Sequence, residues 1–321
     1  MDKNDKKILR ELIKDARKPL SKISKEIKLS RENTYYRINK LIEKKIIKQY
    51  ITLINYKLLG FQRFSTFIEL KMIDEEKESQ IINFLKNQKR VSWIGIISGR
   101  WSLTFDIFAK NNSELNKFIN KFFREYGEYI RDYLLLNIQE EEFFFNKLID
   151  KNQIKFPKIN KTKIKMDKID FEILKKLNEE SKISYIKLSQ ELNLSANTIK
   201  NRIKKLEKSQ IITKHTISIN HKAFGLEWHG IQIKLLKQSE KIETKIKEYF
   251  RKEEKIIFYY QYNKTGIYDF DIGVVLKNSS EFREFIKKIR KQFYDEIKIL
   301  DMFLVLEEET SHHLPEIIFS Q

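Results

Sequence analysis

The first 61 residues carry apolar side chains at the spacing of three short helices. One face of the first helix is formed by Ile8, Leu9, Leu12 and Ile13. Pro19 interrupts this pattern, and after a shorter apolar stripe Ser30 is placed to cap a third helix. Short helices with a tight turn before the third are typical of a helix-turn-helix. Ile46 and Ile47 then begin an extended stretch, which we predict to form a wing and a connecting strand.

Residues 62–145 alternate between the period of a strand and the period of a helix. The apolar spacing gives a strand near Phe64, a helix near Ile81, strands at residues 91–97 and near Phe105, a helix near Phe118, and a strand at residues 133–138. This order, βαββαβ, is the ferredoxin-like pattern. One such sheet leaves an apolar face uncovered, so we expect it to pair with another copy of itself.

The whole pattern then occurs a second time. Residues 166–226 align with residues 1–61 without a gap, and 22 of the 61 positions are identical. The chain has only eight glycines, and Gly60 and Gly225 fall in register. Residues 227–312 repeat the βαββαβ order. A repeat this long indicates a domain duplication. We therefore predict an α+β protein in which two winged helix-turn-helix domains alternate with two ferredoxin-like domains.

The repeat sets the expected domain boundaries. The predicted segments are a first DNA-binding domain at 1–61, a first ferredoxin-like domain at 62–145, a basic linker at 146–165, a second DNA-binding domain at 166–226, and a second ferredoxin-like domain with a C-terminal tail at 227–321.

Charge is divided unevenly among these segments. Of the net charge of +19, residues 1–61 carry +10, residues 166–226 carry +5 and the linker carries +6, whereas each ferredoxin-like segment carries −1. Because the positive excess lies on one type of module and on the linker, it points to a polyanion. No apolar run is long enough to span a membrane, and there is no cysteine to form disulfides or thiolate metal sites. We expect a cytoplasmic protein that binds double-stranded DNA, with no cofactor, no metal and no membrane partner.

The third helix of each DNA-binding domain should present its outward side chains to the major groove. Asn and Arg pair with base edges, and Lys mainly meets phosphate. The predicted DNA-binding residues are Ser30, Arg31, Asn33, Tyr35, Tyr36, Arg37 and Lys40 in the first copy and Ser195, Asn197, Thr198, Lys200, Asn201, Arg202 and Lys204 in the second. The recurrent arginines, Arg37 and Arg202, are equally suited to an ion pair within the module. Since the two helices differ, an asymmetric operator is expected.

The segments "LSRENTYYRINKLIEKKII" and "LSANTIKNRIKKLEKSQII" resemble the helix-turn-helix of the leucine-responsive/asparagine-synthetase regulator (Lrp/AsnC) family, and "MDKIDFEILKKL" is similar to that family's first helix. The resemblance covers nearly the whole chain, twice. It implies a transcriptional regulator whose ferredoxin-like domains pair and bind a small effector, typically an amino acid, between copies. The sequence leaves open whether the pairing is a pseudo-dimer within one chain or a homodimer of two chains.

The resemblance also implies an effector site at the turn between strands two and three, where the family often has Gly-x-Tyr-Asp. The second copy keeps this motif as Gly266, Tyr268 and Asp269, and its carboxylate suits a ligand ammonium. The first copy has Gly99, Trp101 and Ser102 instead, which puts amino-acid binding by that copy in doubt. A hairpin turn with no ligand is the alternative reading for both.

Two other functions fit the same architecture. Siroheme decarboxylases are similar in design but act on a tetrapyrrole, which calls for substrate-gripping His and Arg residues. Here residues 62–145 contain no histidine and residues 227–311 contain only His229, so we do not expect an enzyme. A DNA-compacting architectural protein is the other alternative. The acidic runs 140–142 and 307–309 are interpreted as solvated edges or inter-subunit contacts rather than as catalytic acids.

Overall fold

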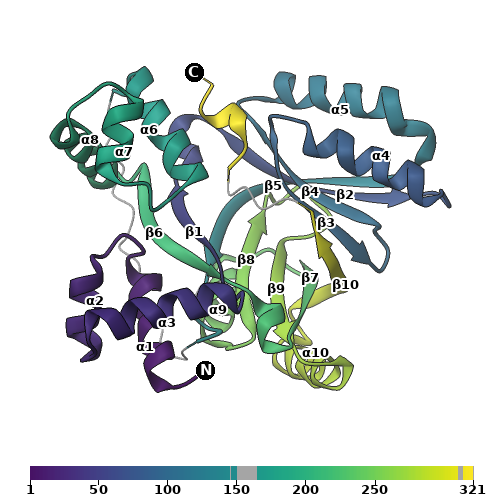
Figure 1. The fold of residues 1–321 in the computed structure, drawn as a ribbon. Coiled ribbons are helices and arrows are strands. Elements are labelled where there is room, and N and C mark those ends of the chain that lie inside the picture. Colours follow the sequence, from purple (N-terminus) through teal and green to yellow (C-terminus); the bar gives the residue numbers. More distant parts are fainter. Residues whose placement is uncertain (145, 150–164, 310–313, 321) are drawn as a thin grey trace. The chain divides into compact units, whose positions relative to one another are not determined.

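The computed structural model describes residues 1–144, 146–149, 165–309 and 314–320 (Figure 1). The chain forms two compact units. We call residues 1–61, 149–223 and 312–321 the headpiece unit, and residues 62–148 and 224–311 the barrel unit. Each unit therefore contains a part of both repeats. Most of the predicted linker, residues 150–164, lies outside the described residues.

The first headpiece contains the three expected helices, α1 (Lys3–Lys14), α2 (Leu20–Ile27) and α3 (Arg31–Glu43). Asp2 caps α1 through a capping box with Asp5, and the Ser30 side chain caps α3. Lys28 ends α2 with a φ of 59°, in the left-handed region that makes the turn tight. The apolar stripe read from the sequence is buried along α1, as expected for an amphipathic helix.

The second headpiece repeats this arrangement with α6 (Lys168–Glu179), α7 (Tyr185–Glu191) and α8 (Ala196–Lys208). Asp167 forms the capping box and Ser195 caps α8. Asn193 takes the place of Lys28, with a φ of 51°. Asparagine adopts this conformation more readily than lysine does. The turn geometry is thus duplicated along with the sequence.

The strands after the third helices differ from the wing expected from the sequence. β1 (Ile47–Ile54) and β6 (Ile212–Ile219) pair with each other, antiparallel, in a two-stranded sheet (Figure 1). Within the described part of each headpiece, neither strand forms a hairpin of its own. The residues pair Tyr50 with Ile217, Ile51 with Thr216 and Thr52 with His215. The extended stretches therefore join the two headpieces, because each strand finds its hydrogen-bonding partner in the other copy.

The barrel unit contains both ferredoxin-like domains in the predicted order. The first has β2 (Gln62–Leu70), α4 (Glu75–Lys86), β3 (Val91–Ser98), β4 (Leu103–Ala109), α5 (Asn112–Tyr126) and β5 (Ile130–Phe143). The second has β7 (Glu227–Leu235), α9 (Glu240–Lys252), β8 (Ile256–Tyr262), β9 (Phe270–Leu276), α10 (Ser279–Phe293) and β10 (Ile297–Glu308). Short 3-10 helices are η1 (Tyr56–Leu59), η2 (Gly127–Tyr129), η3 (His221–Phe224) and η4 (Glu316–Ile318).

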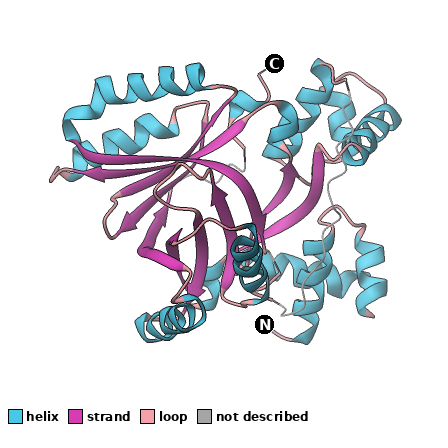
Figure 2. Ribbon diagram, turned by 180° about the vertical axis from the view of Figure 1, so that it is seen from behind, coloured by secondary structure: helices cyan, strands magenta, loops and turns pink. Residues whose placement is uncertain are grey.

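The two sheets close into one barrel with the strand order β10-β3-β4-β2-β5-β8-β9-β7. The copies meet at two antiparallel seams, β5 with β8 and β10 with β3. Helices cover the outside of the strands, as Figure 2 shows. Pairing between copies was expected, and the structure places it within one chain. Closure also removes the open sheet edges at which strands of other chains would add.

The acidic runs of the two copies hold these seams together. Glu142 of the first copy accepts from Arg251 Nε of the second at 2.9 Å, and Glu309 of the second copy forms an ion pair with Lys86 of the first. Lys86 and Arg251 lie 165 residues apart and occupy the same helix position in their repeats. The runs thus make reciprocal contacts between the two copies within one chain.

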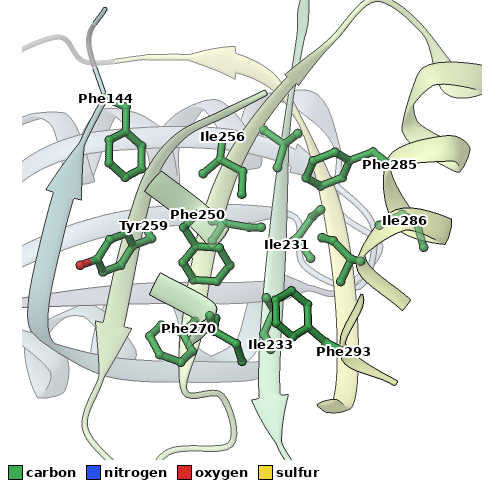
Figure 3. Close-up of a cluster of buried hydrophobic side chains, with 14 of the residues drawn as sticks. Phe144, Ile231, Ile233, Phe250, Ile256, Tyr259, Phe270, Phe285, Ile286 and Phe293 are labelled. Carbon is green, nitrogen blue, oxygen red and sulfur yellow. The ribbon is translucent and has the colours of Figure 1, made fainter. Parts of the chain in front are cut away.

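Each ferredoxin-like domain keeps its own apolar core between its helices and its strands. In the second copy this core gathers Ile231 and Ile233 of β7, Phe270 of β9 and Phe293 of α10 (Figure 3). Phe144, which follows the last strand of the first copy, packs in the same cluster. The chain of one copy thus completes the core of the other, so the two domains are joined by packing as well as by backbone pairing.

The C-terminal segment belongs to the headpiece unit rather than to the second ferredoxin-like domain, with which the sequence analysis grouped it. Asn178 of α6 donates from Nδ2 to the Leu314 carbonyl at 2.9 Å and accepts from the Leu314 amide at 3.2 Å. Leu314, Ile318 and Phe319 are buried. His312 and His313 lie outside the described residues. No helix among the described residues has the length and apolar character to cross a membrane.

Candidate nucleic-acid interface

The third helix of each headpiece presents one polar face to solvent. The apolar face is fixed by Thr34, Ile38 and Leu41 in α3 and by Ile199, Ile203 and Leu206 in α8, all buried. The opposite face is exposed at Arg31, Asn33, Tyr35, Tyr36 and Lys40 and at Asn197, Lys200, Asn201 and Lys204. The predicted outward residues are thus brought together on each helix, as the helical period requires.

The N-terminal end of each third helix is fixed by its capping serine. Ser30 Oγ accepts from the Asn33 amide at 3.1 Å, and Ser195 Oγ accepts from the Thr198 amide at 3.0 Å. Ser195 Oγ also lies 2.8 Å from Thr198 Oγ1. These three predicted contact residues therefore have a structural part, which is to set where the helix begins.

Arg37 and Arg202 form ion pairs inside their own headpieces. Arg37 Nη1 lies 2.7 Å from Asp2 Oδ2 and 2.8 Å from Asp5 Oδ1, and Arg37 Nε donates to Asn33 Oδ1. Arg202 makes the equivalent pairs with Asp167 and Asp170. Backbone hydrogen bonding at Asp5 and the Arg37 guanidinium lower the pKa of Asp2. Each arginine thereby ties the third helix to the start of the first, the ion-pair role that the sequence left open.

The two exposed faces differ in chemistry. On α3, Tyr35 and Tyr36 are 59% and 62% exposed, and the Lys40 ammonium lies 5.7 Å from the centre of the Tyr36 ring. On α8 the corresponding positions are Lys200 and Asn201. The exposed face of α3 is thus aromatic at two positions where the exposed face of α8 is polar or charged.

The seam between the headpieces is built from contacts that cross from one copy to the other. The Ala16 amide donates to the His215 carbonyl at 3.0 Å, and Thr216 Oγ1 donates to the Ile13 carbonyl at 2.9 Å. Thr52 Oγ1 lies 2.8 Å from Ser181 Oγ and 3.0 Å from His215 Nδ1, all three buried. These bonds join the first headpiece to the second within the headpiece unit.

The residues of the turn predicted to bind an effector form hydrogen bonds with neighbouring residues of the barrel unit. In the second copy, Asp269 Oδ2 accepts from the Leu235 amide at 2.8 Å, and Oδ1 accepts from Lys234 Nζ at 3.2 Å and from Gln238 Nε2 at 3.1 Å. In the first copy, Ser102 Oγ accepts from the Leu70 amide at 3.1 Å, the equivalent bond. Both residues therefore hold the end of the first strand of their domain.

The other residues of these turns lie against the opposite copy or inside the barrel. A side chain at Gly99, whose φ is 145°, would meet the Met302 carbonyl, and one at Gly266 would meet Leu136. Trp101 and Tyr268 are buried in the interior cluster of the barrel. The glycines are therefore explained by the close approach of each turn to the last strand of the other copy.

A polar network inside the barrel was not predicted from the sequence. Arg63 of β2 binds Asp106 Oδ2 at 2.5 Å, Glu141 Oε2 at 2.7 Å and the Tyr260 hydroxyl at 2.8 Å. Asp271 of β9 is buried nearby and accepts from the Tyr262 hydroxyl at 3.2 Å. The sequence did contain an indication of this network, since Asp106 and Asp271 interrupt largely apolar strands. Their partners could not be predicted, because these lie on strands far apart in sequence.

Together these features define a class of protein, a tandem helix-turn-helix protein with paired ferredoxin-like domains. Residues 1–42 match the model of the AsnC-type helix-turn-helix domain, and residues 166–213 match that of winged helix-turn-helix DNA-binding. An uncharacterized HTH-type transcriptional regulator of Pyrococcus abyssi is 32% identical over 124 residues, which cover 39% of this chain and 82% of the relative. The HTH-type transcriptional regulator Ptr1 of Methanocaldococcus jannaschii is 35% identical over 123 residues, 38% of this chain and 79% of the relative.

The chain belongs to the Lrp/AsnC family of HTH-type transcriptional regulators. The resemblance seen in the sequence and the α+β prediction are both confirmed. Over its whole length the fold is similar to that of the siroheme decarboxylase NirDL, with a TM-score of 0.68 and 15% identity over 99% of this chain and 97% of that one. At this identity the likeness concerns the fold alone.

Proposed function

We propose that this chain is a sequence-specific DNA-binding transcriptional regulator that reads two different half-sites with α3 and α8. The observation that carries the proposal is the pair of exposed polar helix faces, each set on a capped helix in the module type that carries most of the positive charge. Charge alone would give non-specific binding, whereas ordered Asn, Arg and Tyr side chains on a fixed helix are suited to base edges.

The fused arrangement supports an asymmetric operator. In a homodimer the two reading helices are identical, so the operator tends to be a palindrome. Here both helices belong to one chain and differ at exposed positions. Tyr35 and Tyr36 in the first copy align with Lys200 and Asn201 in the second. We expect two unlike half-sites, spaced by about one helical turn (~34 Å) or a multiple of it.

The test is selection of bound duplexes from a random pool with the full chain, followed by footprinting. Two protected half-sites of different sequence at one fixed spacing support the proposal. Equal binding to all duplexes supports the architectural alternative and contradicts sequence-specific regulation. A palindromic consensus contradicts the proposal that α3 and α8 bind half-sites of different sequence.

Replacing both Tyr35 and Tyr36 by alanine should change base preference at one half-site and leave the other unchanged. Because both side chains are exposed, we expect folding stability to change by less than about 0.5 kcal/mol. Loss of base contacts should cost about 1–3 kcal/mol of discrimination. Selection from the random pool checks the half-site, and thermal unfolding checks the fold. An unchanged consensus would remove these tyrosines from the reading surface.

An amino-acid-like effector is proposed for the barrel unit, at the turn containing Gly266, Tyr268 and Asp269. Because three protein donors already bind Asp269, a ligand ammonium must displace Lys234 from that carboxylate. Calorimetric titration of a panel of amino acids into the protein and into an Asp269→Asn variant tests this. Binding that survives the substitution would place the effector elsewhere.

We propose that the chain is not a siroheme decarboxylase, in spite of the shared fold. His229 is buried and stacks on Phe282 of α10, with ring centres 4.4 Å apart. Its ring therefore lies on the helix side of β7, away from the barrel interior. The visible spectrum of the protein mixed with an iron tetrapyrrole gives the test. A stoichiometric shift in the spectrum with loss of a carboxyl group from the tetrapyrrole would establish the enzyme instead.

A further inference from the structure

Two cations lie at the seam between the headpieces, each against residues of the other copy. Arg17 follows α1 and Lys182 follows α6, and they occupy the same position in the two repeats. Each lies against the other copy. Arg17 Nη1 donates to the Ser181 carbonyl at 2.6 Å, and its guanidinium lies 5.0 Å from the centre of the Tyr185 ring. Lys182 Nζ lies 4.5 Å from the centre of the Tyr50 ring.

Neither cation is neutralised by a carboxylate within the part of the chain that the structure describes. Arg17 Nε is buried and has no hydrogen-bond partner there. Partial burial and the nearby Arg17 guanidinium lower the pKa of Lys182, as expected when two like charges are held together. The adjacent Lys18, in contrast, binds Glu11 and Glu26. The seam thus holds two positive groups that no carboxylate of the described residues neutralises.

Arg17 and Lys182 are related by the same two-fold symmetry as the two copies. The strands β1 and β6 pair about Ile51 and Thr216, which are equivalent residues, so the ribbon has a local two-fold relation. Arg17 and Lys182 are related in the same way. Because Arg17 belongs to the first headpiece and Lys182 to the second, one anion bound by both side chains would contact both headpieces.

We propose that Arg17 and Lys182 together bind one phosphate-type oxyanion at the seam between the headpieces. A guanidinium offers two parallel donors to such an oxyanion and an ammonium adds a point charge, and both rings hold these groups in place. The oxyanion is either a backbone phosphate of DNA between the half-sites or a free phosphate group. The first source rests on the proposed DNA-binding function, and the second does not.

The experiment compares the full chain with the double variant R17Q/K182Q. The matched control is K117Q/R124Q, which removes the same charge from exposed positions of α5 in the barrel unit. One measurement is the dependence of DNA affinity on salt, with a duplex selected by the wild-type protein. The other is the thermal midpoint in inorganic phosphate against chloride at equal ionic strength.

If DNA supplies the oxyanion, the slope of log affinity against log salt becomes shallower by about 1 in the double variant and stays unchanged in the control. If the oxyanion is free phosphate, phosphate raises the midpoint of the wild-type protein and of the control, but not of the double variant. Either result supports the site. An unchanged slope together with an unchanged phosphate response overturns it.

The failure of the site and the failure of the proposed function are distinguishable. A double variant that binds its selected duplex with the wild-type slope, and responds to phosphate as the wild type does, removes the site and leaves the regulator intact. A wild-type protein with no sequence preference for DNA contradicts the proposed function, and the phosphate measurement still decides the site.

Discussion

Replacing Arg63 by methionine is expected to destabilise the barrel unit by roughly 3–5 kcal/mol. The Arg63 side chain is 11% exposed, and it is bound to Asp106, itself 4% exposed, and to Glu141. Removal of the guanidinium leaves both carboxylates without their cation inside the barrel, and breaking a buried pair in this way costs more than the pair contributes when intact. Arg63 also links the two copies, because it binds the Tyr260 hydroxyl of β8.

Tryptophan fluorescence during urea unfolding gives the measurement, because all three tryptophans, Trp93, Trp101 and Trp228, lie in the barrel unit. The matched control is Arg100→Met. Arg100 pairs with Asp132 at 2.9 Å, but the side chains are 53% and 48% exposed, and such surface pairs contribute about 0–1 kcal/mol. An equal loss in the free energy of unfolding in the two variants would show that the interior network stabilises the barrel no more than a surface ion pair does.

The second large effect is a dependence of barrel stability on pH. Burial raises the pKa of Asp271 from 3.8 to about 7, with a contribution from nearby Asp106. A raised acid pKa means that the folded chain binds more protons than the unfolded chain between these two values. This contribution to the free energy of unfolding is therefore fully present below pH 3.8 and is lost as the pH rises from there to about 7. Between pH 5 and pH 8 the expected loss is roughly 3 kcal/mol.

An Asp271→Asn variant isolates this contribution. The difference in the free energy of unfolding between wild type and variant should fall with rising pH, since the amide cannot ionise. The Asp132→Asn variant is the control, because the side chain of Asp132 is 48% exposed. A difference that stays constant from pH 5 to pH 8 would mean that Asp271 is ionised throughout, with a cation or water supplying the partner that its Oδ1 lacks among the described residues.

The duplication has a physical consequence for regulation. In a dimer of separate chains, the fraction of protein in which the two DNA-binding helices are paired depends on the protein concentration. Here the seam bonds of Thr52 and Thr216 and the closed barrel hold both copies within one chain. Under the proposed function, the second half-site would be bound at an effective concentration fixed by the fold rather than by the amount of protein. The interior positions are also free to diverge, as Arg63 and its counterpart Trp228 have done.

Much of this protein was determined by the sequence itself. The stripe from Ile8 to Ile13, the caps at Ser30 and Ser195, and the alternation in the barrel strands depend on neighbours within a few residues, so periodicity predicts them. The exposed faces of α3 and α8 follow from the same rule. The repeat added the duplicated architecture, and the family resemblance followed from its motifs.

Other features were decided only by tertiary structure. Four features join residues far apart in sequence: the pairing of β1 with β6 in place of a wing, the closure of both sheets within one chain, the Arg63 network, and the hydrogen bond from Arg17 to the Ser181 carbonyl. The periodicity of a strand predicts which side chains share a face, but not which strand lies beside it. The choice of partner depends on how the whole chain buries its apolar faces and satisfies its backbone bonds, and this is settled only when the chain has folded.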